Sequence, residues 1–234
     1  MKISILTLFP QMFTGSFDHS IVKNAIHKKL LTINFINLRD FGKNKHKIVD
    51  DKPYGGGTGM LLKVDVVEKA IQKAKDKKSS KKQKVILLDP RGKTYDQKKA
   101  KEFSKIQHLI LVCGHYEGID GRIDNFVDEK ISIGDFILTG GEIPAMVITD
   151  SVVRLLEGSL KKQATEIESF SPCLPAGTAY LEYPQYTKPR VYKNYSVPDI
   201  LLLGNHKKIE EWRKSASLAY TKKFRPDLLK NNAS

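Results

Sequence analysis

Near-continuous apolar runs are the feature that most constrains how this chain folds. KVILLD at 84–89 and HLILVC at 108–113 carry apolar side chains at almost every position, and KISILTLF at 2–9 is also rich in β-forming residues. Strands that are apolar on both faces are typical of a parallel sheet covered by helices on both sides. The sequence therefore predicts an α/β domain built on a parallel sheet.

Segments with helical spacing separate these runs along the chain. One helix face is marked by Val64, Val67, Ile71 and Ala74. The clearest helix covers 143–157, because Pro144 suits its first turn and Gly158 stands just past its end. Further helices are expected at 20–30 and 95–106, and further strands at 32–38 and 126–133.

Other stretches show neither the spacing of a strand nor that of a helix. Residues 39–60 are basic at first and Gly-rich at the end, which predicts a long functional loop. The lysine-rich run at 75–84 predicts a solvated loop. Residues 158–198 predict a linker with little regular structure, and a final helical segment is expected at about 205–232.

The charge balance indicates a class of partner. The chain has 40 Lys and Arg against 26 Asp and Glu, a formal net charge of +14. Such an excess favours a polyanion such as nucleic acid, although a lysine-rich solvated surface gives the same count. Cys113 and Cys173 lack the spacing of a disulfide framework or a zinc site, so we expect no metal, and Cys113 is expected to be buried. No run approaches the roughly 20 apolar residues of a membrane span, so we expect a cytoplasmic protein.

Three loops each follow an apolar strand, at 89–93, 114–122 and 134–142. They lack the Walker and Rossmann glycine motifs for phosphates. Because ligands bind at the carboxyl ends of strands in open α/β sheets, the loops predict one shared pocket. The alternative interpretation is that they are ordinary turns whose acidic residues cap helices. Glycines, with carboxylates at Glu117, Asp135 and Glu142, favour a neutral heterocycle that carries a cationic group.

Five ordered motifs carry a family resemblance: PYGGGTGM, LVCGHYEGID, ISIGDFILTGGEIPAM, LEYPQYTKPR and GNHKKIEEWR. They resemble those of the bacterial tRNA (guanine-N1)-methyltransferases, the TrmD-type proteins of the SPOUT superfamily. The resemblance implies an α/β domain over 1–158, with a SPOUT-type parallel sheet and a C-terminal trefoil knot. A flexible linker over 159–198 and a small α-helical tRNA-binding domain over 199–234 would follow. It also implies a homodimer with composite active sites.

The resemblance further implies that S-adenosyl-L-methionine is the cofactor. Phe136 stands where the family commonly has Tyr, which keeps the apolar contact and removes a hydroxyl. The residues expected to form its pocket are Leu87, Gly114, Tyr116, Glu117, Ile133, Gly134, Asp135, Phe136, Ile137, Leu138, Gly140, Gly141 and Pro144.

Two catalytic roles follow from the resemblance. Arg154 occupies the position of an arginine that would donate to guanine O6, and a helical ion pair with Asp150 or Glu157 is the alternative interpretation. The family's base is an Asp in a DSF-like triplet, and here the triplet is Glu168-Ser169-Phe170. Glu168 is therefore the expected base and Glu166 the reserve, unless both acids are exposed linker charges.

The expected substrate is tRNA, at the guanosine just 3′ of the anticodon. The residues expected to contact it are Arg39, Lys45, Lys47, Tyr54, Lys188 and Arg190, each of which would also suit a plain surface position. Two alternatives stay open: a tRNA ribose 2′-O-methyltransferase with the same cofactor loops, and a non-catalytic RNA-binding factor, which the Glu-for-Asp change suggests.

Overall fold

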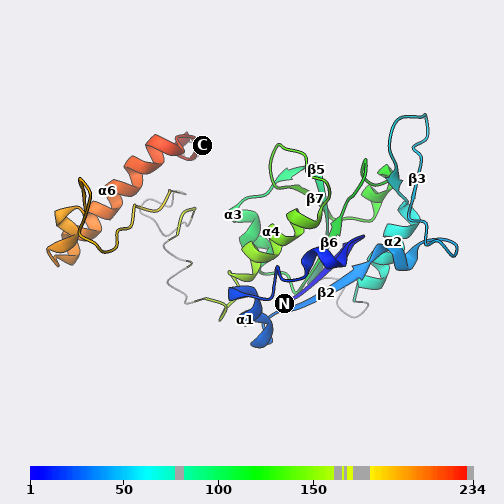
Figure 1. Cartoon of the computed structure of the whole chain (residues 1–234), viewed down its shortest axis with the longest axis horizontal. Helices are drawn as coiled ribbons and strands as arrows, with labels where there is room; N and C mark the ends of the chain where they lie inside the picture. Colours follow the sequence, from blue (N-terminus) through cyan, green and yellow to red (C-terminus); the bar gives the residue numbers. More distant parts are fainter. Residues whose placement is uncertain (77–81, 161–164, 166–167, 171–179, 231–234) are drawn as a thin grey trace. The chain divides into compact units, whose positions relative to one another are not determined.

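The computed structural model describes residues 1–76, 82–160, 165, 168–170 and 180–230. The chain divides into two compact units, Met1–Leu160 and Lys161–Ser234, and Figure 1 shows the elements of each.

The first unit is built on a five-stranded sheet in the order β2-β1-β6-β5-β7, in which every neighbouring pair is parallel. Its strands are β1 (Lys2–Thr7), β2 (Thr32–Asn37), β5 (Gln83–Thr94), β6 (His108–Cys113) and β7 (Glu129–Ser132). Its helices are α1 (Ser20–His27), α2 (Val64–Ala74), α3 (Gln97–Phe103) and α4 (Glu142–Val153), with 3-10 turns η1 (Pro10–Phe13), η2 (Leu38–Phe41) and η4 (Gly121–Asn125). The predicted α/β class with a parallel sheet is confirmed.

Two apolar cores lie on opposite faces of this sheet. On β6, Leu109 and Leu111 pack with α1, α3 and α4, whereas Ile110 and Val112 pack with α2, η2 and η4. Successive side chains of a strand point to opposite faces, so a strand between two helical layers must be apolar at every position. All six residues of β6 are buried, as the run HLILVC predicts.

The strand predicted at 84–89 is longer than expected. β5 continues through the predicted loop 89–93 to Thr94, and its pairing with β7 shifts register between Leu88 and Lys93. A β-bulge of this kind bends the strand and re-aims its side chains. A Cβ on Gly92 would overlap the backbone of Ile131, so the close approach there requires glycine.

Other boundaries also differ. The predicted loop 39–60 contains η2 and the short strand β3 (Asp50–Asp51), which pairs with β4 (Leu61–Leu62). The helix predicted at 143–157 ends at Val153, so Gly158 is not its cap.

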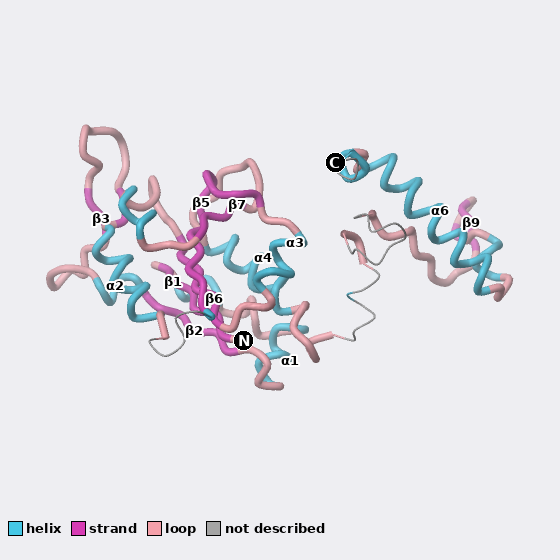
Figure 2. The backbone as a smooth tube through the Cα atoms, turned by 180° about the vertical axis from the view of Figure 1, so that it is seen from behind, coloured by secondary structure: helices cyan, strands magenta, loops and turns pink. Residues whose placement is uncertain are grey.

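The second unit holds more regular structure than the expected linker. A hairpin of β8 (Val191–Tyr192) and β9 (Tyr195–Ser196) interrupts it, followed by η5 (Asp199–Leu202). The predicted C-terminal helical segment is α6 (His206–Phe224) and α7 (Asp227–Lys230), and Figure 2 shows α6 as a long continuous helix. Asn205 caps α6, because its Oδ1 accepts from Lys208 N at 3.2 Å.

Cys113 is a buried thiol at the end of β6, as expected, and burial raises its pKa well above the usual value. Cys173 lies outside the described residues. In the part of the chain that the structure describes, no helix is long and apolar enough to cross a membrane.

His108 gives the first unit a pH-dependent stability. Its Nε2 lies 2.9 Å from Ser4 Oγ, and burial lowers its pKa to about 4. An unfolded histidine titrates near pH 6.5, so between about pH 6.5 and 4 the unfolded chain binds more protons than the native one. We expect this group to remove up to about 3 kcal/mol of unfolding free energy as the pH falls through that window.

Urea unfolding at pH 7.5 and pH 5 measures this effect. His108→Gln should show a smaller loss of stability between the two pH values than wild type. The exposed His19→Gln variant should keep the wild-type loss. An unchanged pH dependence in His108→Gln would contradict the assignment.

Candidate cofactor and RNA site

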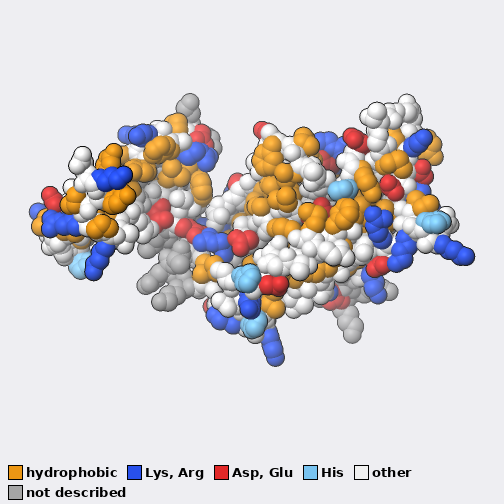
Figure 3. Space-filling view, viewed as in Figure 1, with side chains coloured by type: hydrophobic (Ala, Val, Ile, Leu, Met, Phe, Trp, Pro, Cys, Tyr) orange, Lys and Arg blue, Asp and Glu red, His pale blue; other side chains and the backbone are white. Residues whose placement is uncertain are grey.

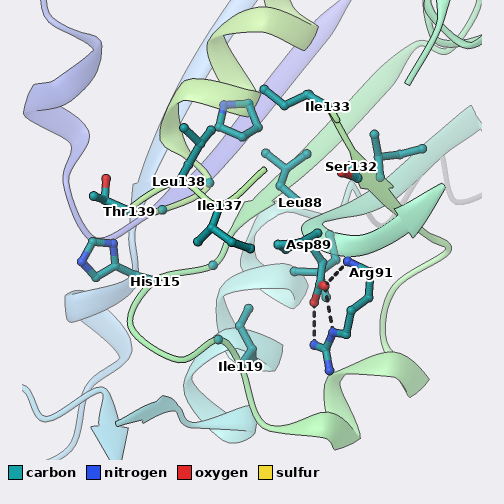
Figure 4. Close-up of a pocket in the computed structure, with 18 of the residues that line it drawn as sticks. Leu88, Asp89, Arg91, His115, Ile119, Ser132, Ile133, Ile137, Leu138 and Thr139 are labelled. Carbon is teal, nitrogen blue, oxygen red and sulfur yellow. Dashed lines mark hydrogen bonds and ion pairs between the residues drawn. The ribbon is translucent and has the colours of Figure 1, made fainter. Parts of the chain in front are cut away.

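A cavity of about 460 Å³ opens at the carboxyl ends of β6 and β7, beside the middle of β5 at Leu87–Arg91. The three segments predicted to share a pocket contribute to its walls, and Figure 4 shows one residue of each, Asp89, His115 and Ile137, around it. The volume falls in the range of small-molecule sites, about 300–1,000 Å³. The alternative that these loops are only unrelated turns does not explain their convergence.

The expected cofactor residues converge on this cavity with one exception. Asp135 is not among the lining residues, while its neighbours Gly134 and Phe136 are. The expected residues that do line it are Leu87, Gly114, Tyr116, Glu117, Ile133, Gly134, Phe136, Ile137, Leu138, Gly140, Gly141 and Pro144.

Two loops touch backbone to backbone at the floor of the cavity. Gly141 N donates to Gly114 O at 2.8 Å, and His115 forms a β-bridge with Gly140. A Cβ on Gly141 would lie 2.7 Å from Cys113 Cα and 2.9 Å from Gly114 N. Only glycine allows this contact, because both neighbouring atoms belong to the backbone.

The loop after β6 is a tight turn. Tyr116 adopts a φ of +58° and Gly118 a φ of +114°, and Gly118 N donates to His115 O at 3.0 Å. Glu117 N donates to Met60 O at 3.1 Å, and Leu62 N to Gly118 O at 2.9 Å. The Gly-rich end of the segment 39–60 is therefore fastened to the cavity wall.

An arginine–carboxylate fork stands at one side of the cavity. Arg91 donates through Nε to Asp89 Oδ1 at 2.9 Å and through Nη2 to Oδ2 at 2.6 Å, as Figure 4 shows. These hydrogen bonds hold the pKa of Asp89 below its usual value, so the carboxylate stays ionised. Both residues of this ion pair line the cavity, so the pair adds no net charge there.

Several lining residues were not singled out from the sequence. They are Leu88, Asp89, Pro90, Arg91, His115, Gly118, Ile119, Ile131, Ser132 and Thr139. Only their position in the sequence could have indicated them, because most lie within or directly beside the three predicted loops.

Glu142 has a role different from the expected one. It is the first residue of α4, its side chain is 1% exposed, and it is not among the lining residues of the cavity. Thr7 Oγ1 donates to its Oε1 at 2.6 Å. The carboxylate therefore belongs to the core beneath the Gly140–Gly141 turn, where the N-terminus of α4 favours a negative charge.

The two expected catalytic residues belong to different units. Arg154 directly follows α4 in the first unit, and its N donates to Asp150 O at 3.2 Å. Glu168 belongs to the second unit. The reserve candidate Glu166 lies outside the described residues.

The expected RNA contacts fall on both units. Arg39 lies in η2, and Tyr54 is fully exposed near the Gly-rich stretch. Figure 3 shows Lys and Arg side chains around the end of the first unit that carries β3. Lys47 Nζ lies 3.2 Å from Asp40 Oδ1, and in the second unit Arg190 Nη2 lies 3.3 Å from Asp199 Oδ1. The other two are Lys45, in the turn after η2, and Lys188, which precedes the cis-proline Pro189.

In parallel α/β sheets, a glycine-lined cavity near the carboxyl ends of the strands is the usual place of a small-ligand site. The chain belongs to the tRNA (guanine-1)-methyltransferase family, TrmD, whose family description matches residues 1–231. The resemblance that the motifs predict is thereby confirmed.

Curated relatives agree with this family over almost their whole lengths. The tRNA (guanine-N(1)-)-methyltransferase of Bacillus pumilus is 53% identical over 231 residues, covering 98% of this chain and 92% of the relative. A protein of the same name from Listeria innocua is 51% identical, with 99% and 93% coverage. One from Mycoplasmopsis synoviae is 48% identical, with 98% and 97% coverage.

Proposed function

We propose that this protein transfers a methyl group from S-adenosyl-L-methionine to N1 of the guanosine just 3′ of the anticodon in tRNA. The observation that carries the proposal is the cavity of about 460 Å³, because residues 114–117 and most of residues 133–144, which belong to the family motifs, are among those that line it. The names of the relatives support guanine N1 as the target over a ribose hydroxyl, and support an enzyme over a non-catalytic factor.

The residues of the cavity fit the cofactor. Leu87, Ile133 and Leu138 offer apolar contact to an adenine ring, and the backbone around Gly140 can approach it closely. Glu117 provides negative charge for a cationic sulfonium. When bound, S-adenosyl-L-methionine supplies an electrophilic methyl group.

Exposed apolar side chains at the cavity support the same conclusion. Tyr116, Phe136 and Ile137 are 44%, 52% and 81% exposed. Large apolar residues around a cavity are typical of a surface that a ligand covers. We expect a bound heterocycle to bury part of this surface.

The chemistry requires a base and a cation. Guanine N1 carries a proton at neutral pH, and charge gathers on O6 when that proton leaves. We propose that the Glu168 carboxylate takes the N1 proton and that the Arg154 guanidinium donates to O6. The deprotonated N1 would then take up the methyl group that the bound cofactor supplies, and the electrons of the sulfonium–methyl bond would stay with sulfur.

The architecture beyond the sheet is part of the proposal. Family membership supports a SPOUT-type domain over 1–158 with a C-terminal trefoil knot and a small helical tRNA-binding domain over 199–234. It also supports a homodimer with composite active sites that works in the cytoplasm. Asp135 stays a proposed cofactor residue through its motif alone.

Methyl transfer to paired transcripts tests the proposal. One tRNA transcript carries G directly after the anticodon and the other carries A. We expect N1-methylguanosine from the first and no product from the second. Equal rates with both transcripts, or a 2′-O-methylated product, would overturn the proposal.

Tyr54 offers a test of RNA contact. Its ring is fully exposed beside Gly55 and Gly56, so it can stack on an unpaired base. Stacking contributes about 1–3 kcal/mol per base, so Tyr54→Ala should weaken tRNA binding by about 5- to 150-fold. Tyr54→Phe, which keeps the ring, should bind nearly as wild type. Filter binding at fixed salt measures both, and equal affinity of Tyr54→Ala and wild type would rule out the contact.

A further inference from the structure

The Glu168-Ser169-Phe170 triplet is fastened to helix α6 by the extended segment 180–182. On one side of this segment, Phe170 N donates to Tyr180 O at 3.0 Å and Glu182 N donates to Ser169 Oγ at 2.9 Å. On the other side, the middle residue Leu181 is bonded to α6. The segment therefore connects the residues around Glu168 to the helix.

Two hydroxyls of α6 hold both polar groups of the Leu181 backbone. Leu181 N donates to Thr221 Oγ1 at 2.9 Å, and Ser217 Oγ donates to Leu181 O. Thr221 Oγ1 in turn donates to Ser217 O at 2.8 Å. We call these two side chains and Leu181 the hydroxyl clamp.

The clamp is buried in a helix that is otherwise largely exposed. Ser217 is 1% exposed and Thr221 is 0% exposed. Serine and threonine are mediocre helix formers, and a buried hydroxyl is costly unless it is hydrogen-bonded. Both hydroxyls form hydrogen bonds with the Leu181 backbone. These bonds explain why two hydroxyl side chains are buried in α6.

The end of the triplet is held in an uncommon conformation. Phe170 has a φ of +65°, and the Arg225 guanidinium lies 5.8 Å from the centre of its ring. A non-glycine residue at positive φ persists only when its surroundings impose it. The bond to Tyr180 and the cation over the ring are the surroundings that do so here.

We propose that Ser217 and Thr221 are positioning residues for the proposed base, through which α6 fixes the direction of the Glu168 carboxylate. This inference rests on the proposed function, because it assigns α6 a role in the chemical step besides RNA binding. A base must be held within a fraction of an ångström of its working geometry, so a loosened triplet lowers the rate without weakening the binding of either substrate.

Thr221→Val tests the clamp, since it keeps the shape of the side chain and removes the acceptor for Leu181 N. We expect the single-turnover rate to fall by about tenfold or more while the affinities for tRNA and cofactor stay within about twofold. Thr221→Ser should restore the rate because it keeps the hydroxyl. Ser215→Ala, at an exposed hydroxyl of the same helix, is the control and should behave as wild type.

A double-mutant cycle separates positioning from general support. If Thr221 acts through Glu168, Thr221→Val should add no further loss of rate in the Glu168→Ala background. A wild-type rate in Thr221→Val, or equal losses in both backgrounds, would overturn the proposal.

Hydrogen exchange at the Leu181 and Glu182 amides gives a readout that does not depend on activity. Thr221→Val should lose protection at both amides, whereas Ser215→Ala should keep it. Unchanged protection would overturn the clamp. The two proposals can fail separately. If the wild-type protein does not methylate the G transcript but Thr221→Val still loses amide protection, the proposed function is overturned and the clamp remains.

Discussion

Replacing Glu168 with glutamine is expected to lower the methyl-transfer rate by about 10²- to 10⁴-fold, the usual effect of a positioned general base. The amide keeps the size of the side chain but cannot take the N1 proton. The affinities for tRNA and cofactor should change little, because the loss is confined to the transition state. Single-turnover methylation at saturating substrates measures the effect.

The pH profile strengthens this test. In Glu168→Gln the residual rate should rise with pH, since N1 must then lose its proton to solvent. Glu211→Gln, at an exposed acid of α6 in the same unit, should retain the wild-type rate. Glu168→Asp should keep a substantial part of the rate, because it restores the family's carboxylate. Full activity in Glu168→Gln would show that a group other than Glu168 is the base.

Replacing Gly141 with alanine is expected to weaken cofactor binding by at least about tenfold. The added Cβ would lie 2.7 Å from Cys113 Cα and 2.9 Å from Gly114 N, so the two loops must separate. Overpacking of this kind costs about 1–3 kcal/mol of stability, and it opens the floor of the cavity. Calorimetric titration with S-adenosyl-L-methionine should show an affinity at least about tenfold weaker.

Gly121→Ala is the matched control for this variant. A Cβ at Gly121 would meet nothing within 4 Å, and Gly121 does not have a positive φ. The control should therefore bind the cofactor as wild type does. If Gly141→Ala also binds normally, the Gly114–Gly141 contact has no part in forming the cofactor site.

The strands of the sheet could be predicted because their signal is local. HLILVC matches β6 at both ends, since a strand between two helical layers must be apolar throughout. The end of β5 could not be predicted. DPRGK reads as a loop by composition, and it continues the strand only because β7 pairs with it across a register shift.

The candidate pocket could be predicted in outline. Loops after parallel strands meet at one edge of the sheet, so the segments holding Gly114 and Gly141 were expected to converge. The amino-acid sequence did not predict which side chains face the cavity. Asp135 lies outside the lining and Glu142 is buried against Thr7, because backbone turns rather than residue type decide these directions.

The sequence by itself determined the α/β class, the order along the chain of the five sheet strands and the main helices, and the family. Each of these depends on apolar periodicity or on contiguous motifs, which are properties of neighbouring residues. Only the tertiary structure decided the contact of Gly141 with Gly114, the burial of Glu142 and the hold of Thr221 on Leu181. These contacts join residues far apart in the chain, and their geometry follows from how the backbone packs once the sheet and helices have formed.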